Sequence, residues 1–309
     1  MKLLNFSVGG ERRLGFSLDE ASVADLGGAA AAVGSDIDLP VDLLELVCSG
    51  AAVQNDIAQI VSRAQQVSDR AGWSWTLSDV TPHFPFRPRK NIIRAGGNSG
   101  TMCGVKKPEP ARRGPGMWSF SGGLRYYTKS PTSVLDPSAA ISWPLDLTEQ
   151  VFAEPQLAIV VGDEIHYATP DEAQRAIFGY AVSTDLSGFD LKIKHGQWDK
   201  AVSLDTFFPW GPFIVTSDEI DEPERLGIRL RLNDEVVIVG STGDTILPIG
   251  EMLSQLSMGI RLEAGDVLLL GTPECVGFGA QPERWLRAGD RVESEIDGVG
   301  VIVNTVAPN

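Results

Sequence analysis

The stretch that decides the fold is residues 151–190, VFAEPQLAIVVGDEIHYATPDEAQRAIFGYAVSTDLSGFD. Two apolar runs, each as long as a buried strand, flank a segment with the signals of a helix start. Glu154 and Gln156 precede the first run, LAIVV, and Asp185 follows the second. Because side chains alternate along a strand, Glu154 and Gln156 share one face. If the runs pair, Asp185 joins them, and such oxygen ligands are typical of a Mg²⁺ or Ca²⁺ site.

Several further motifs extend this pattern in a fixed order. They are DTFFPWGPFIV, LRLNDE, LEAGDVLLLGTPECVG and LRAGDRVESEIDGVG, and the chain opens with MKLLNFSVGGERRLGFSL. Together with FAEPQLAIVVG and GYAVSTDLSGFD, they resemble the fumarylacetoacetate hydrolase family over residues 85–309. Motifs in a fixed order are far more specific than any one of them.

The resemblance implies an α+β fold, a mixed β-sandwich roll with flanking helices, for residues 85–309. Residues 1–80 are expected to form a small N-terminal α/β domain, and the proline-rich segment 81–88, TPHFPFRP, is the expected linker. Strands dominate and do not alternate regularly with helices, which argues against a doubly wound sheet. The resemblance also implies a homodimer.

Local patterns predict the other elements. Residues 1–20 indicate a hairpin, and residues 41–67 indicate helices with a break at Ser49-Gly50. Residues 91–100 indicate a strand followed by a glycine-rich loop. Residues 228–234 indicate a strand that turns at Asn233-Asp234, and residues 249–256 indicate an amphipathic helix. Thr169, Pro170 and Glu172 are the N-cap, first residue and capping box of a further helix. Residues 100–124, which include KKPEPARRGPG, are expected to be a mobile loop.

Composition limits the class of protein. The chain has 309 residues, 43% of them apolar, and a net charge of −15. The acidic balance argues against nucleic-acid binding, which needs a basic face. No apolar run approaches the about 18 residues of a membrane span, so we expect a cytoplasmic protein without a membrane partner. Three widely spaced cysteines, Cys48, Cys103 and Cys275, predict neither disulfides nor a zinc site.

The resemblance implies that Glu154, Gln156 and Asp185 hold Mg²⁺ or Mn²⁺, which would polarise substrate oxygens as a Lewis acid. Gln156 stands where the family has a second Glu, and Phe152 where it often has an Asp. Loss of one negative charge lowers the expected metal affinity, and Gln156→Glu is expected to restore it. Two alternatives stay open: a weakened metal site, or ordinary polar residues in a pocket without metal.

Four positions depart from the residues that the resemblance implies for catalysis. Met102 replaces the histidine that activates water, Ser99 a tyrosine, Val202 a lysine and Phe189 an arginine. None of His83, His166 and His195 stands at a family catalytic position. With Phe152, three of these replacements make the pocket more apolar, which favours a larger and less charged ligand.

The leading hypothesis is therefore a family enzyme with non-hydrolytic chemistry, namely cyclisation, tautomerisation or decarboxylation. Its substrate would be a bulky enolisable dicarbonyl or polyketide-like molecule of secondary metabolism. The alternatives are a metal-dependent C–C hydrolase with Glu109 as base, and a non-catalytic ligand-binding protein. The candidate catalytic residues are Lys129, Lys192, Asp185 and Glu154, and the candidate substrate-binding residues are Asn98, Ser99, Met102, Phe189, Val202, Thr272 and Cys275.

Overall fold

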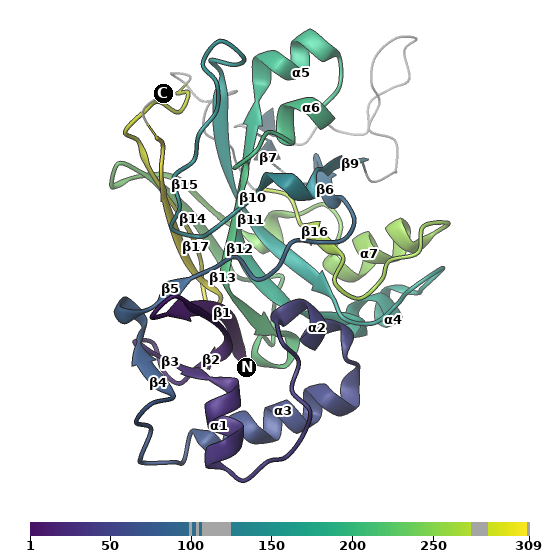
Figure 1. Ribbon diagram of the computed structural model, residues 1–309. Helices are drawn as coiled ribbons and strands as arrows, with labels where there is room; N and C mark the ends of the chain where they lie inside the picture. The colour runs from purple at the N-terminus through teal and green to yellow at the C-terminus, as the bar shows by residue number, and fades with distance from the viewer. Residues whose placement is uncertain (99–100, 103–104, 107–124, 273–283, 308–309) are drawn as a thin grey trace.

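The computed structural model describes residues 1–98, 101–102, 105–106, 125–272 and 284–307. Within these residues, a mixed sheet of 12 strands runs through the molecule, and a 4-stranded sheet packs against its middle (Figure 1). Helices flank the large sheet. The α+β sandwich roll expected from the sequence is confirmed.

The elements have the following bounds. The large sheet contains β1 (Lys2–Val8), β2 (Glu11–Ser17), β3 (Ser22–Asp25), β4 (Ser74–Thr76), β5 (Thr81–Pro82), β6 (Ile92–Gly96), β9 (Arg125–Lys129), β10 (Val134–Leu135), β11 (Val151–Val161), β12 (Ile177–Gly188), β13 (Phe208–Thr216) and β16 (Val267–Leu269). The small sheet contains β14 (Gly227–Leu232), β15 (Glu235–Ser241), β17 (Arg291–Ile296) and β18 (Gly300–Thr305). A separate pair is β7 (Thr101–Met102) with β8 (Val105–Lys106). The helices are α1 (Leu26–Ala32), α2 (Leu43–Cys48), α3 (Ala51–Ala64), α4 (Pro170–Arg175), α5 (Phe189–His195), α6 (Asp199–Val202) and α7 (Ile249–Ser257).

The local patterns predicted these elements well. The hairpin β1–β2, the break between α2 and α3, the hairpin β14–β15 and helix α7 are all present. Thr169 caps α4, and Glu172 completes its capping box. Asn233 and Asp234 both have positive φ, 52° and 68°, as a two-residue turn between twisted strands requires.

The long antiparallel pair β11–β12 is the centre of the large sheet. Glu154 lies directly opposite Asp185 in this pair, and every residue of both strands is buried. One face of the pair packs toward the small sheet, where the Thr184 and Ser294 hydroxyls lie 2.6 Å apart. The polar residues at one end of these strands are therefore held in a rigid frame.

The N-terminal strands extend the same sheet. The strand order is β4-β3-β2-β1-β13-β12-β11-β16-β6-β9, so β1 pairs with β13 of the C-terminal region. Helices α1 to α3 cover the lower end of the molecule in Figure 1. The division into domains 1–80 and 85–309 stays a prediction.

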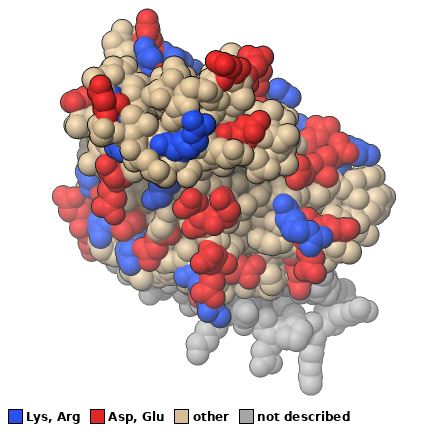
Figure 2. Space-filling view, turned by 90° about the horizontal axis from the view of Figure 1, so that it is seen from below, with Lys and Arg blue, Asp and Glu red and all other residues tan. Residues whose placement is uncertain are grey.

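The surface is acidic. Figure 2 shows acidic side chains spread over one face, with basic ones singly or in pairs between them. None of the described helices has the length and apolar character to cross a membrane. Cytoplasmic localisation stays a prediction.

The contact between β12 and β13 is tight at Gly179. A Cβ at this position would lie 2.4 Å from the Val215 carbonyl oxygen, whereas at Gly27 in α1 the nearest atom would be 3.4 Å away. We expect Gly179→Ala to lower the free energy of unfolding by about 2 kcal/mol, as overpacking does. The control Gly27→Ala should be neutral or stabilising by up to about 1 kcal/mol. Denaturant unfolding measures both, and equal effects would contradict the packing argument.

Candidate active site

A buried cluster of charged side chains lies where four strands of the large sheet meet. Glu154 comes from β11, Asp185 from β12, Lys129 from β9 and Arg94 from β6. Each of the four has at most 6% of its surface exposed. Buried charges of this kind are stable only when they are paired, so the contacts within the cluster decide what it can bind.

Arg94 joins the two carboxylates. Its Nη2 donates to Glu154 Oε2, and its Nε lies 2.6 Å from Asp185 Oδ2. Its third nitrogen, Nη1, donates to the Ser187 hydroxyl at 3.0 Å. The guanidinium therefore lies between the carboxylates that the sequence assigned to a metal. The ring centroids of Tyr127 and Trp198 lie 5.1 and 6.0 Å from its Cζ.

Lys129 holds Asp185 from the other side. Its Nζ lies 2.9 Å from Asp185 Oδ1 and donates to the carbonyls of Leu186, Val202 and Phe207. Burial lowers the pKa of Lys129 to about 8, Asp185 opposes the shift, and Arg94 adds to it. Because the partners of Nζ are all acceptor oxygens, Lys129 serves as a positive charge and donor in the cluster. Arg94 Nε and Asp185 Oδ1 meet their partners as ion pairs rather than as aligned hydrogen bonds.

Gln156 lies beside Asp185 but turns its amide nitrogen toward it. Nε2 donates to Asp185 Oδ2 at 2.9 Å, and Oε1 accepts from the Gly271 backbone N–H at 3.0 Å. The reverse orientation would set oxygen against carboxylate and NH₂ against N–H, so these two contacts fix the amide. Gln156 is therefore a donor to the cluster.

This arrangement does not fit the divalent cation that the sequence resemblance implies. Both oxygens of Asp185 are engaged by cations or by the amide, and Gln156 offers N–H where a metal needs oxygen. Arg94 bridges Glu154 and Asp185 at the point where the cation would bind them. Within the described ranges, no group of three or more His, Cys, Asp or Glu side chains is arranged for a metal.

Aromatic side chains form a wall beside the cluster. Phe152 and Phe189 both contact Trp285, with ring centroids 6.3 and 6.1 Å apart. Tyr127 stacks on Trp198 at 5.6 Å. We call these five residues the aromatic wall. It brings together Phe152 and Phe189, which the sequence analysis placed in an apolar pocket.

The other candidate residues have different surroundings. Lys192 Nζ lies over the rings of Phe189 and Trp198, at 5.7 and 5.6 Å, and so borders the aromatic wall. Asn98 is engaged in packing, since Nδ2 donates to Leu270 O at 3.0 Å and Oδ1 accepts from Leu247 N at 2.9 Å. Val202 contacts the cluster through its backbone carbonyl, which accepts a hydrogen bond from Lys129 Nζ.

Thr272 is buried next to the end of the described segment. Ser99, Glu109, Cys275 and most of loop 100–124 lie outside the described residues, and only the backbone of Met102 is described. The histidines lie outside the buried cluster: His83 contacts Ser7 and Asp136, and His166 and His195 are exposed.

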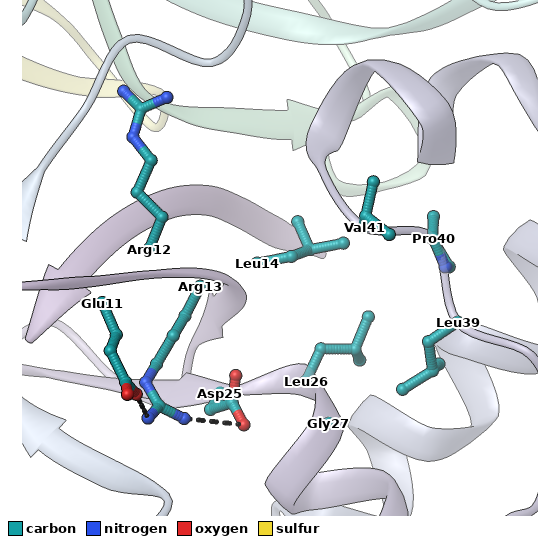
Figure 3. Close-up of a pocket in the computed structure, with 10 residues that line it drawn as sticks. All are labelled: Glu11, Arg12, Arg13, Leu14, Asp25, Leu26, Gly27, Leu39, Pro40 and Val41. Carbon is teal, nitrogen blue, oxygen red and sulfur yellow. Dashed lines mark hydrogen bonds and ion pairs between the residues drawn. The ribbon is translucent and has the colours of Figure 1, made fainter.

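A separate hollow of about 520 Å³ lies in the N-terminal region (Figure 3). Its residues come from β2, α1, the end of β3 and the segment 39–41, and none belongs to the charge cluster. Its charges are matched internally, because Arg13 pairs with Glu11 at 2.7 Å and with Asp25 at 3.5 Å. The charge cluster, and not this hollow, contains the candidate site residues Glu154, Gln156, Asp185 and Lys129.

Arg94 is the residue that the sequence analysis missed. The pattern of segment 91–96, NIIRAG, indicates only an apolar strand. An arginine inside such a run is almost never buried without a partner. That signal points to a nearby carboxylate, although it does not say which one.

Comparisons with known proteins show the family. The sequence model described as "Fumarylacetoacetate (FAA) hydrolase C-terminal" matches residues 91–307. The chain belongs to the fumarylacetoacetate hydrolase family.

Individual members of the family are similar to this chain over nearly its whole length. The chain is 32% identical to oxaloacetate tautomerase YisK of Bacillus subtilis (strain 168) over 298 residues, which is 95% of each chain. A fumarylacetoacetate hydrolase from Exiguobacterium antarcticum superimposes with a TM-score of 0.81 at 29% identity and full coverage of both chains. A 2-hydroxyhepta-2,4-diene-1,7-dioate isomerase from Mycobacterium marinum has the same fold, with a TM-score of 0.71 at 22% identity, covering 99% of this chain and 98% of that one. Family membership thus supports an enzyme.

The paired contacts of Lys129 predict its effect on stability. Lys129→Met removes a charge that Asp185 needs in the interior, so we expect a loss of about 3 kcal/mol in the free energy of unfolding. Lys200→Met changes an exposed lysine of α6 and should cost less than about 0.5 kcal/mol. Urea unfolding measures both variants. A loss below about 1 kcal/mol for Lys129→Met would show that Asp185 does not depend on it.

Proposed function

We propose that this protein is an isomerase that interconverts the keto and enol tautomers of an enolisable 2-oxo acid. The observation that carries the proposal is the similarity to an oxaloacetate tautomerase over 95% of both chains. The cluster supports it, because tautomerisation needs a base and a positive charge but no activated water. No described histidine lies in the cluster to activate water.

The reaction moves one proton. The C–H bond next to the carbonyl breaks, its electron pair forms the C=C bond, and the carbonyl oxygen gains a proton. We assign the removal of the carbon-bound proton to Glu154, the more exposed of the two cluster carboxylates. Arg94 stabilises the negative charge that develops on the oxygen. Lys129 and Asp185 position Arg94, and Lys192 is the candidate for binding a carboxylate of the substrate.

The aromatic wall supports a finer proposal about the substrate. Phe189 and Trp285 are partly exposed and pack with the buried Phe152, so they offer apolar surface near the charges. The substrate therefore combines an anionic 2-oxo acid with an apolar body. This keeps the bulky, apolar substrate expected from the sequence and adds a charged end. A role in secondary metabolism stays a prediction.

Hydrolysis of a C–C bond is the second candidate, because a protein titled fumarylacetoacetate hydrolase superimposes on the full chain at 29% identity. Its proposed base, Glu109, lies outside the described residues. Cleavage of acylpyruvates at roughly 1 s⁻¹ or faster would favour hydrolysis over tautomerisation.

The test of the proposed function uses Glu154→Gln. We expect the enzyme to accelerate keto–enol exchange of oxaloacetate above the uncatalysed rate, measured by the ultraviolet absorbance of the enol. The variant should lose about hundredfold or more in kcat, as the loss of a general base does. Glu164→Gln, at an exposed glutamate paired with Arg261, is the control and should keep the full rate. If wild type leaves the exchange rate unchanged for oxaloacetate and for an aryl-substituted 2-oxo acid, the proposed function is wrong.

A second experiment tests the apolar part of the substrate. Trp285→Ala removes the ring that Phe152 and Phe189 both contact. We expect kcat/KM to fall about tenfold or more for an aryl-substituted 2-oxo acid, which corresponds to about 1.4 kcal/mol, and to change little for oxaloacetate. Trp75→Ala in β4 is the control for the loss of an indole. Equal losses on both substrates would contradict a binding role for the wall.

A further inference from the structure

We propose that the Arg94 guanidinium replaces the divalent cation in this protein, so that the cluster is complete without Mg²⁺ or Mn²⁺ and does not bind either. This inference concerns metal binding and stands apart from the proposed function. It rests on how Glu154, Gln156 and Asp185 are already used in the fold.

Charge balance is the first argument. Glu154 and Asp185 supply two negative charges, and Arg94 and Lys129 supply two positive ones within ion-pair distance. A divalent cation at the same carboxylates would add two positive charges beside Arg94 in a buried site. Like charges repel strongly where water does not screen them, so the cation and Arg94 exclude each other.

The shape of the guanidinium is the second argument. Each of its three nitrogens faces a different oxygen-bearing side chain: Nε faces Asp185, Nη2 Glu154 and Nη1 Ser187. Its Cζ lies 5.1 and 6.0 Å from the ring centroids of Tyr127 and Trp198, which stack on each other, and such aromatic contacts favour a guanidinium over a hydrated metal ion. Arg94 therefore has a site built around it from β6, β9, β11 and β12.

Gln156 is the third argument. An amide that donates to Asp185 and accepts from Gly271 adds an N–H to the cluster without adding charge. A glutamate at this position would bring a third carboxylate against two cations, and one of its oxygens would face Asp185 Oδ2 with no hydrogen to share. Gln156 thus suits a cluster whose cations are Arg94 and Lys129.

The test titrates Mn²⁺ into wild type and three variants. Electron paramagnetic resonance measures the free Mn²⁺ that remains, and thermal unfolding measures the shift of Tm. Wild type and Gln156→Glu should show no saturable Mn²⁺ site, because Arg94 remains in both. This replaces the expectation from the sequence that Gln156→Glu restores metal affinity. Arg94→Ala/Gln156→Glu removes the cation that bridges Glu154 and Asp185 and supplies a third carboxylate, and it should bind one Mn²⁺ at least tenfold more tightly than wild type. Its Tm should rise with Mn²⁺ concentration.

Arg231→Ala is the matched control, because Arg231 also bridges two carboxylates, Glu293 and Glu295, on the small sheet. It should gain no Mn²⁺ site, which shows that freeing a carboxylate pair is not enough.

One saturable Mn²⁺ per wild-type chain overturns the inference, and this measurement holds even if the double variant does not fold. A folded double variant that gains no Mn²⁺ affinity also overturns it. Keto–enol exchange after chelation is measured separately. A metal-free but inactive wild type would refute the proposed function and leave this inference intact.

Discussion

The pairing of Arg94 and Lys129 with Glu154 and Asp185 is the interaction on which the rest of this structure depends. Four charged side chains from four strands are buried in one place, and the ion pairs make their burial tolerable. The strands β6, β9, β11 and β12 must therefore keep their relative positions. The sheet supplies this rigidity, because β11 and β12 are buried on both faces.

The same frame separates two environments next to each other. The matched charges form the polar part, and the aromatic wall, whose members Tyr127 and Trp198 lie over Arg94, forms the apolar part. Phe152 lies two residues before Glu154 in β11, and Phe189 follows the end of β12, four residues after Asp185. Both belong to the aromatic wall. Charged and aromatic side chains thus lie only a few residues apart along β11 and β12. Such a site suits a ligand with one charged and one apolar end.

Sequence patterns predicted much of this arrangement. Alternation along a strand placed Glu154 and Gln156 on one face, and turn and cap signals located the hairpins and α4. The contacts of Arg94 could not be predicted, because Arg94 reaches Glu154 across a distance of 60 residues in sequence and the pairing of β6 with β16 is not local. The orientation of the Gln156 amide depends on the Gly271 N–H, which only the folded chain brings near.

The balance of charge in the cluster also constrains how this sequence can change over time. Replacing Arg94 or Asp185 alone leaves a buried charge without its counterpart, whereas replacing a cation and an anion together keeps the sum at zero. Substitutions at these positions should therefore be inherited in compensating pairs. A change from a metal-holding arrangement to this one passes through sequences with an unpaired buried charge unless two positions change together. Such unbalanced sequences should therefore be rare among related proteins.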